Sequence, residues 1–426
     1  MGMTIAAKIF SGAAAGRAVR PGDYVDARID RLIAHEEFYR IHTAAVEGGL
    51  EDGLPHIWDL DRFHVVLEHF QPALNPTQAI RARRMREIAA RYGLRHFKDT
   101  LAGVLHRIAL EDYVVPGELA LGSDSHSCAW GALNCAGTGM GEHELAYAAV
   151  TGELWFRVPE SIKVVLQGEL QPGVTAKDVA LWLGGRFGTS FALYQSLEFT
   201  GPGAAAMSLE GRFTLAAHAV ELGAKFGLFD YDDKTEAFLA QRQDFERLRA
   251  QMRPVSADAD AEYEQEVVVD LAALPPQVAR PHTFENVVPV GEVRGVRVSQ
   301  AQVGSCANGH IEDIALLAQA LAGRKVHPDT RLFVQPSSWG VYRAAMEQGH
   351  FAQILDAGGQ VLSPGCHLCL GMQGALAPGD VCISSTTRNF RGRMGSGEAE
   401  IYLASPVTVA AAAIAGEIVD PREVAQ

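Results

Sequence analysis

The sequence predicts an α/β fold with two or three domains. Short runs rich in β-branched residues recur along the chain, and several lead into turns rich in glycine and serine and then into helical segments. This repetition of strand, loop and helix is typical of α/β architecture. A chain of 426 residues is also too long for one ordinary hydrophobic core, and its 48% hydrophobic and 21% charged residues are typical of a globular protein.

The individual elements are expected in a regular order. Residues 77–92 have the spacing of an amphipathic helix, with basic side chains on one side and Ile80, Met85 and Ile88 on the other. A second helix is expected to begin near residue 311. Strands are expected at 162–166, 267–269, 296–303, 331–334 and 381–383.

Two boundaries divide the chain into three expected domains. Proline, aspartate and alanine cluster without periodicity between residues 254 and 281, as they do in linkers. We place one boundary just after this stretch and another near Val158-Pro159. The expected domains are residues 1–160, 161–285 and 286–426.

Composition indicates which kinds of binding partner and which cellular compartment to expect. The formal net charge is −14 and the sequence has no basic stripe, which argues against nucleic acid but not against a small anionic substrate. The longest apolar stretch, residues 407–415, is well short of the ~20 residues that a membrane span needs. The amino terminus lacks the features of a signal peptide, and six cysteines do not make a disulfide scaffold in a chain of this size. We expect a cytoplasmic protein with reduced cysteines and no membrane partner.

Three cysteines have the arrangement of metal ligands. Cys306 follows the strand expected at 296–303, and Cys366 and Cys369 form a CxxC pair. All three lie in polar loops that carry glycine, where backbone amides can approach the sulfurs. Closed sites normally have four protein ligands, whereas a catalytic metal keeps one position for substrate. The pattern therefore favours an open metal centre.

Other interpretations of these cysteines remain open. CxxC also marks redox pairs and half zinc sites, although a redox pair is expected after a first strand and not near the carboxyl terminus. Three buried cysteines without a metal are a further alternative, because free cysteine is among the most buried residue types. Cys128, Cys135 and Cys382 lie among apolar or small residues and are expected to be structural.

Candidate acid–base residues lie in the first half of the chain. Asp124 and His126 share a short loop, where the carboxylate can orient the ring or can instead cap a helix. His69 and His106 have apolar neighbours, which by themselves favour a core role. Glu198 lies between apolar residues near the end of an expected strand, so it needs a partner, and an arginine is the structural alternative to a catalytic role.

Arg388 and Arg393 are candidate anion ligands. They belong to Arg388-Asn-Phe-Arg-Gly-Arg393, which is followed by glycines at positions 395 and 397 and predicts a tight loop more than a charged helix face. Arginine holds carboxylates through paired hydrogen bonds, whereas the alternative is a solvated surface charge. Three soft ligands together with such arginines predict a metal centre that handles a di- or tricarboxylate.

Together these residues resemble the aconitase superfamily, and within it the large subunits of the isopropylmalate isomerase and homoaconitase group. The resemblance runs through nearly the whole chain. Its motifs occupy residues 114–119, 122–126, 151–163, 170–174, 207–214, 304–313 and 388–395.

The resemblance implies a cofactor and a reaction. It implies a four-iron four-sulfur (4Fe-4S) cluster on Cys306, Cys366 and Cys369, with one open iron that acts as a Lewis acid on the substrate. Water leaves, the alkene intermediate turns over, and water returns at the neighbouring carbon. The implied acid–base and hydrogen-bonding residues are His69, His106, Asp124, His126 and Glu198, and Arg388 and Arg393 are implied to hold substrate carboxylates.

The resemblance also implies a partner. Members of the family have three α/β domains around the cluster and a fourth, swivelling domain that supplies a serine base and a further arginine. This sequence has no region that resembles the fourth domain, so we expect a separate small subunit to provide it.

The sequence departs from the family pattern at several positions. Glu68 replaces the usual aspartate before His69, so its longer side chain is expected to miss a hydrogen bond, and Thr387 replaces an asparagine. His367-Leu368 replaces Gly-Pro between the paired cysteines. His35-Glu-Glu-Phe38 stands where the family usually has a His/Asn-Asp-x-Thr stretch that lines the site. Phe38 thus replaces a small hydroxyl residue and is expected to reshape or block the substrate pocket.

The expected activity is that of a hydro-lyase that isomerises a 2-substituted malate to the 3-substituted isomer, of the 3-isopropylmalate dehydratase type. Alternatives within this class are a homoaconitase and a side-pathway dehydratase for an alkyl-, aryl- or dimethylmalate. An alternative from another class is a cluster-free relative that regulates or binds RNA, against which the acidic charge argues. A third is a protein with structural zinc on the three cysteines.

Overall fold

The computed structural model describes residues 2–36, 38–99 and 102–424, which separate into two compact units. Unit 1 comprises Met1–Leu166, Ala192–Ala205 and Gly223–Val269. Unit 2 comprises Gln167–Phe191, Ala206–Leu222 and Asp270–Gln426. Both units are therefore built from segments that are discontinuous in the sequence.

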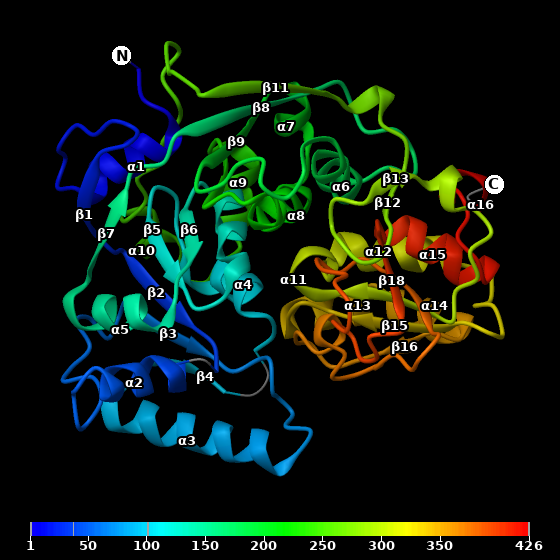
Figure 1. Ribbon diagram of the computed structural model, residues 1–426, viewed down its shortest axis with the longest axis horizontal. Helices are drawn as coiled ribbons and strands as arrows, with labels where there is room; N and C mark the ends of the chain where they lie inside the picture. Colours follow the sequence, from blue (N-terminus) through cyan, green and yellow to red (C-terminus); the bar gives the residue numbers. More distant parts are fainter. Residues whose placement is uncertain (1, 37, 100–101, 425–426) are drawn as a thin grey trace. The chain divides into compact units, whose positions relative to one another are not determined.

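Unit 1 contains a parallel five-stranded sheet (Figure 1). Its central strands are buried at all four positions, as expected for a parallel sheet that is covered on both faces. Helix α2 (Phe38–Glu47) packs against both α3 (Pro76–Tyr92) and α5 (Glu142–Thr151). The strand order is β4 (His96–Lys98), β3 (Phe63–Val66), β2 (Arg31–Ala34), β5 (Leu119–Gly122) and β6 (Ala136–Gly139).

Unit 1 also contains a four-stranded sheet and an antiparallel ribbon. The ribbon pairs β1 (Tyr24–Arg28) with β7 (Glu153–Arg157). Helix α1 (Ile5–Ala13) buries Ile5, Ile9 and Phe10 in one hydrophobic core with the apolar residues of this ribbon. The four-stranded sheet has the order β10 (Phe226–Phe229), β9 (Ser196–Thr200), β8 (Ser161–Gln167) and β11 (Gln265–Asp270).

Unit 2 is built on a seven-stranded sheet that is mostly parallel (Figure 1). Its strand β12 runs antiparallel to both of its neighbours. Helix α12 (Ile311–Leu321) packs against α14 (His350–Ala357) and α15 (Pro406–Ala415). The strand order is β13 (Val287–Pro289), β12 (Gln277–Ala279), β18 (Glu400–Ala404), β17 (Val381–Ser384), β14 (Gln300–Gly304), β15 (Arg331–Gln335) and β16 (Gln360–Val361).

The structure confirms the α/β class and most expected elements. The helix expected at 77–92 is α3, which begins after the capping residue Asn75 and ends at Gly93 in the left-handed conformation. The strand expected at 296–303 is shorter, because β14 begins only at Gln300. Before it, the backbone around residues 296–298 bonds instead to residues 416–418, through an isolated bridge and the hydrogen bonds beside it.

The three expected domains remain a prediction, although each expected segment contains strands of a different principal sheet. The five-stranded sheet falls within 1–160, and the four-stranded sheet falls within 161–285. The seven-stranded sheet draws mainly on 286–426 but takes β12 from the preceding segment. The two units cut across this division, since helices from the middle segment belong to unit 2.

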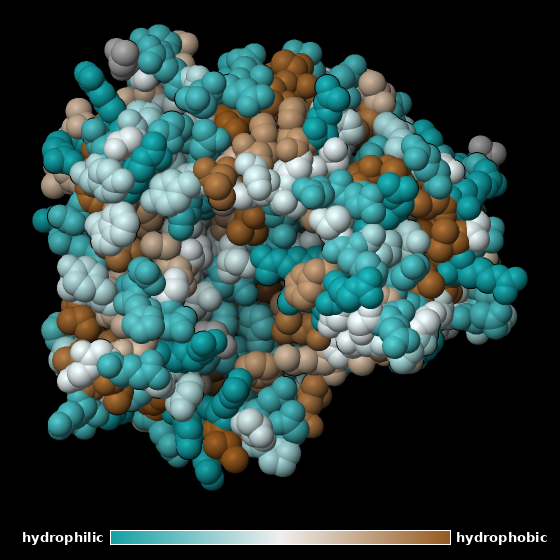
Figure 2. Space-filling model, viewed as in Figure 1, coloured by the Kyte–Doolittle hydropathy of each residue, from teal (hydrophilic) through white to brown (hydrophobic). Residues whose placement is uncertain are grey.

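The surface visible in Figure 2 mixes hydrophilic residues with scattered hydrophobic ones. Within the described part of the chain, no helix combines the length and the hydropathy needed to span a membrane.

Candidate functional site

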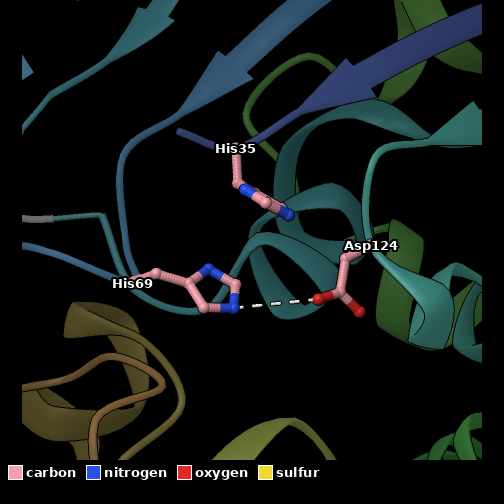
Figure 3. Close-up of side chains that lie close together, drawn as sticks. All are labelled: His35, His69 and Asp124. Atoms are coloured by element: carbon pink, nitrogen blue, oxygen red, sulfur yellow. Dashed lines mark ion pairs between the residues drawn. The ribbon is translucent and has the colours of Figure 1, made fainter. Parts of the chain in front are cut away.

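A group of ionisable side chains lies beyond the carboxyl ends of three adjacent strands in unit 1. His35 directly follows β2, His69 follows β3, and Asp124 follows β5. Because these strands are parallel neighbours, their carboxyl ends lie at one edge of the sheet, where α/β folds bind ligands. Figure 3 shows the two rings and the carboxylate converging there.

His69 is held by carboxylates on both sides. Its Nδ1 lies 3.2 Å from Glu68 Oε1 and 3.7 Å from Glu36 Oε2, and its Nε2 lies 3.7 Å from Asp124 Oδ2 (Figure 3). Burial alone would lower the pKa of the ring, but Glu68 and Glu36 hold that pKa well above the ordinary value of 6.5. The two carboxylates therefore favour the protonated form of the His69 ring.

Asp124 caps a helix and also contacts histidine rings. The sequence left these two roles as alternatives, and the structure shows both contacts. Its Oδ1 accepts a hydrogen bond from the backbone N–H of His126 at 2.8 Å, which caps the 3₁₀ helix η2 (Ser125–Leu133). The same oxygen lies 2.9 Å from His106 Nε2. Burial would raise the pKa of the Asp124 carboxyl, but His106 and His126 hold it well below 3.8.

His106 is buried, and its partner is polar. It lies on the short helix α4 (Leu105–Ile108) and is followed by a π-helical turn at Ala109–Tyr113, a feature that is frequent at functional sites. Only 2% of the residue is exposed. Its contact with Asp124 favours the expected acid–base role over that of an apolar core residue.

His35 and Glu36 were named from the sequence only within a stretch that departs from the family pattern, and neither was given a role. The His35 ring centroid lies 4.5 Å from that of His69, and burial and His69 together lower the pKa of His35 to about 4. Glu36 Oε1 accepts hydrogen bonds from the backbone N–H groups of Glu68 at 2.6 Å and Phe70 at 3.0 Å. Both residues directly follow a fully buried strand. The rule that located Cys306, that ligands bind beyond the carboxyl ends of strands, could also have located them.

Glu198 has the contacts of a structural residue. It lies on β9 and accepts hydrogen bonds from the backbone N–H groups of Ile5 at 3.1 Å and Ala6 at 3.0 Å, at the amino terminus of α1. Ser161 Oγ and Tyr263 Oη also donate to it, at 3.0 Å and 3.1 Å. Its partner is thus a helix terminus and not the arginine considered as an alternative, and these contacts favour a structural role over the catalytic one.

Phe38 lies in the hydrophobic core of unit 1. Its side chain is fully buried, and its ring centroid is 5.0 Å from that of Phe63 and 6.2 Å from that of Tyr92. The structure therefore gives Phe38 a packing role in place of the expected pocket-lining role.

The three candidate ligand cysteines lie in unit 2, at the carboxyl edge of the seven-stranded sheet. Cys306 is on the helical turn α11 (Ser305–Asn308), which begins as β14 ends at Gly304. Gly304 is paired with Gln335 on β15. The side chain of Gln335 holds the other loop, because its Nε2 donates to Ser363 O at 3.0 Å and its Oε1 accepts from the Leu368 N–H at 3.0 Å. One residue thus ties both cysteine loops to the same edge.

Cys366 and Cys369 are buried in that second loop. They are 8% and 2% exposed, and Cys306 is 3% exposed. Cys369 Sγ lies 3.8 Å from Thr387 Oγ1, so the residue that replaces the family asparagine keeps a polar contact with a cysteine. His367 also turns inward, with its Nδ1 3.1 Å from Gln335 Nε2.

The two candidate anion ligands are oriented by different partners. Arg388 Nε donates to Glu221 Oε1 at 2.7 Å, and the Arg388 side chain is 27% exposed. Arg393 Nη2 lies 3.2 Å from Cys369 Sγ, and its guanidinium carbon is 5.4 Å from the ring centroid of Phe390. Arg393 therefore places a fixed cation beside one of the thiols.

Comparison with known proteins decides the family. The model of the aconitase family (aconitate hydratase) matches residues 64–295 and 291–416. The chain belongs to the aconitase family. Similar curated proteins are the 3-isopropylmalate dehydratase large subunit 1 of Methanopyrus kandleri, 42% identical over 99% of both chains, and large subunit 2 of Archaeoglobus fulgidus, 43% identical over 99% of this chain and 100% of its own.

A solved structure supports the fold alone. The holo-form of aconitase X from Thermococcus kodakaraensis aligns with a TM-score of 0.52 at 10% identity, and the alignment covers 94% of this chain and 90% of that one. The family model and the curated relatives confirm the expected membership, and the structural likeness confirms the aconitase-like α/β fold.

Membership of the aconitase family implies a 4Fe-4S cluster, and the residues of unit 2 fit one. Cys306, Cys366 and Cys369 supply soft thiolate donors from two loops that are held at one sheet edge. The three other cysteines are buried, and burial raises the pKa of the Cys135 and Cys382 thiols, which suits a structural role and not ligation. The expected ligand set thus stays a prediction that the donor chemistry supports.

The Glu68→Gln change is expected to lower the pKa of His69. Because that pKa is raised, the ion pair stabilises the fold fully below pH ~6.5, and this contribution is lost as pH rises through the folded-state pKa. Removing the Glu68 charge weakens the contribution and lets the ring lose its proton at lower pH. Titration of ¹⁵N-labelled histidine rings by NMR measures the shift, with the exposed Glu47→Gln on α2 as control. An unchanged His69 titration would show that Glu68 does not set its charge.

Proposed function

We propose that this chain is the cluster-bearing large subunit of a hydro-lyase that isomerises a 2-substituted malate, with isopropylmalate as the substrate. The observation that carries the proposal is the likeness, over essentially the full length, to proteins named 3-isopropylmalate dehydratase large subunit. The buried acid–base group and the three cysteine thiols supply the residue types that this chemistry requires.

Unit 2 is assigned the binding of the cofactor and of the carboxylates. Cys306, Cys366 and Cys369 would hold the 4Fe-4S cluster, which when bound supplies through one open iron a Lewis acid for the substrate hydroxyl and carboxylate. Glu221 fixes the plane of the Arg388 guanidinium through Nε, which orients its terminal N–H groups for a carboxylate. Arg393 adds a second cation for the same purpose.

Unit 1 is assigned the proton transfers to and from oxygen. With Glu68 and Glu36 at its Nδ1, the His69 imidazolium can release its Nε2 proton to the hydroxyl that leaves. The same carboxylates then hold the neutral ring in place, so that it can accept a proton when water returns. Asp124 keeps His106 and His126 oriented during both steps.

The purified chain is expected to have negligible turnover on its own and to regain it when a small subunit is added. The resemblance assigns removal of the C–H proton to a serine of the swivelling domain, and the relatives named large subunits indicate that a small subunit supplies this domain. The measurement is dehydration of 2-isopropylmalate by the anaerobically reconstituted chain, with and without the small subunit. Full activity of the chain alone would contradict the proposal.

A panel of substrates separates the alternatives within the class. The reconstituted complex would be assayed on isopropylmalate, homocitrate, dimethylmalate and aryl-substituted malates, and a kcat/KM at least about tenfold higher for one of the others would reassign the substrate. A cluster-free regulatory role predicts RNA binding without bound iron, which the net charge of −14 disfavours. We place the enzyme in the cytoplasm, with its six free cysteines reduced.

A further inference from the structure

Unit 2 buries a lysine whose hydrogen-bond acceptors are uncharged. Lys177 is on α6 (Ala176–Phe187) and is 0% exposed. Its Nζ donates to Thr386 O at 2.7 Å and to His218 Nε2 at 2.8 Å. A lysine is almost never buried completely unless an opposite charge compensates it, because desolvation penalises the ammonium.

The neighbour of Lys177 has a defined tautomer. His218 Nδ1 lies 2.7 Å from Thr214 O, a carbonyl that can only accept, so Nδ1 carries the proton. Nε2 then presents its lone pair to the ammonium. The His218 ring also stacks on Phe284, with ring centroids 5.6 Å apart, which fixes its orientation. The histidine is therefore a neutral acceptor that aims Lys177 and does not balance its charge.

The same hydrogen-bonded chain reaches both cysteine loops. Thr386 precedes Thr387, whose Oγ1 is 3.8 Å from Cys369 Sγ. At the other end, Thr214 Oγ1 donates to Ala307 O at 2.7 Å, and Ala307 follows Cys306. The ammonium is thus tied through short contacts to the segments that carry two of the three thiols.

Electrostatics indicate what compensates the ammonium. Burial lowers the pKa of Lys177 to about 7, whereas Glu221, Cys306, Cys369 and Asp178 raise it. Glu221 already pairs with Arg388. Asp178 accepts hydrogen bonds from the backbone N–H groups of Thr175 and Gln277. The thiols add further negative charge, because three thiolates outweigh the positive charge of an oxidised iron–sulfur core. The assembled centre is therefore an anion that Lys177 can balance, together with Arg393 beside Cys369.

We propose that Lys177, aimed by His218, is a positioning residue that serves as the internal counter-ion of the iron–sulfur centre. The inference rests on the proposed function only in requiring that a cluster binds. A buried cation beside the cluster favours its more negative, reduced state and opposes its release. Lys177 therefore raises the reduction potential of the cluster and slows its loss.

The test compares Lys177→Met with Lys325→Met, a matched loss of an exposed lysine in the same unit. Both variants and the unchanged chain would be reconstituted anaerobically, analysed for iron and acid-labile sulfide, and titrated with reductant while the reduced cluster is followed by electron paramagnetic resonance. We expect Lys177→Met to shift the cluster about tenfold toward its oxidised form, or about 59 mV for one electron, and to lose iron faster to a chelator. We expect Lys325→Met to match the unchanged chain.

Two further variants separate an electrostatic role from a structural one. Lys177→Arg keeps the charge and is expected to keep the potential near that of the unchanged chain, while His218→Met releases the ammonium and is expected to shift the potential in the same direction as Lys177→Met, by less. His218→Met also serves if Lys177→Met does not fold. Equal potentials in the unchanged chain and in whichever of these two variants folds would overturn the inference. Failure of the unchanged chain to bind sulfide would instead overturn the proposed cofactor.

Discussion

Replacing Cys306 with serine is expected to remove iron and sulfide from the reconstituted protein and to abolish turnover. A serine hydroxyl is a harder donor than a thiolate and remains protonated at neutral pH, so one of the three expected ligands is lost. The Lewis acid contributes several kcal/mol to the transition state, so its loss lowers kcat by about 10³-fold or more. Iron and sulfide analysis, together with the assay on isopropylmalate, measures both effects.

Cys382→Ala is the matched control for this change. Cys382 is fully buried on β17, and burial raises the pKa of its thiol. Its removal is expected to cost stability by leaving a small cavity, while iron, sulfide and kcat stay near their original values. A Cys306→Ser variant that keeps a full complement of sulfide would exclude Cys306 as a ligand. Zinc without sulfide in the unchanged chain would support the structural-zinc alternative.

Asp124→Asn is expected to lower kcat by about 10²- to 10⁴-fold while the fold and the cluster remain intact. The amide oxygen can still accept the His126 N–H, so the cap of η2 survives, since asparagine and aspartate cap about equally well. The negative charge that faces His69, His106 and His126 is lost, and with it the charge state that proton transfer needs. Steady-state kinetics of the complex and the spectrum of the cluster separate the two properties.

Glu198→Gln is the control, because it neutralises another buried carboxylate of unit 1. Its partners are the first turn of α1, Ser161 and Tyr263, so we expect a loss of roughly 1–3 kcal/mol in the free energy of unfolding and a kcat near the original value. Denaturant unfolding measures the loss. A kcat that falls as far in Glu198→Gln as in Asp124→Asn would restore Glu198 to the catalytic group.

The local sequence pattern was sufficient to locate those candidate residues whose position depends on a single strand–loop–helix unit. Cys306 could be located because β14 precedes it and α12 follows, and Asp124 because capping is a short-range property. The same rule would have located His35 at the end of β2. Strand β2 has only four residues, Arg31–Ala34, and so short a run is too weak a pattern to be recognised as a strand from the sequence.

Partners from distant segments could not be predicted from the sequence. Arg388 and Glu221 are 167 residues apart, and Glu198 is 192 residues from Ala6. Single-sequence patterns carry periodicity and local propensity, but not which distant groups meet. The assignment of α6 and of α8 (Leu209–His218) to unit 2 escaped prediction for the same reason, since it follows from packing of α6 on β12 and of α8 on α11.

The hydrogen bonds between Glu198 and the first turn of α1 have a consequence for biosynthesis. Helix α1 cannot acquire its carboxylate acceptor until the ribosome has added the 192 residues that separate Ala6 from Glu198, which takes roughly 10–40 s at ~5–20 residues per second. Throughout that interval Ile5, Ile9 and Phe10 lack part of their native core, because Phe226 and Leu228 have not yet been made. The nascent chain therefore carries α1 with an incompletely buried apolar face throughout this interval.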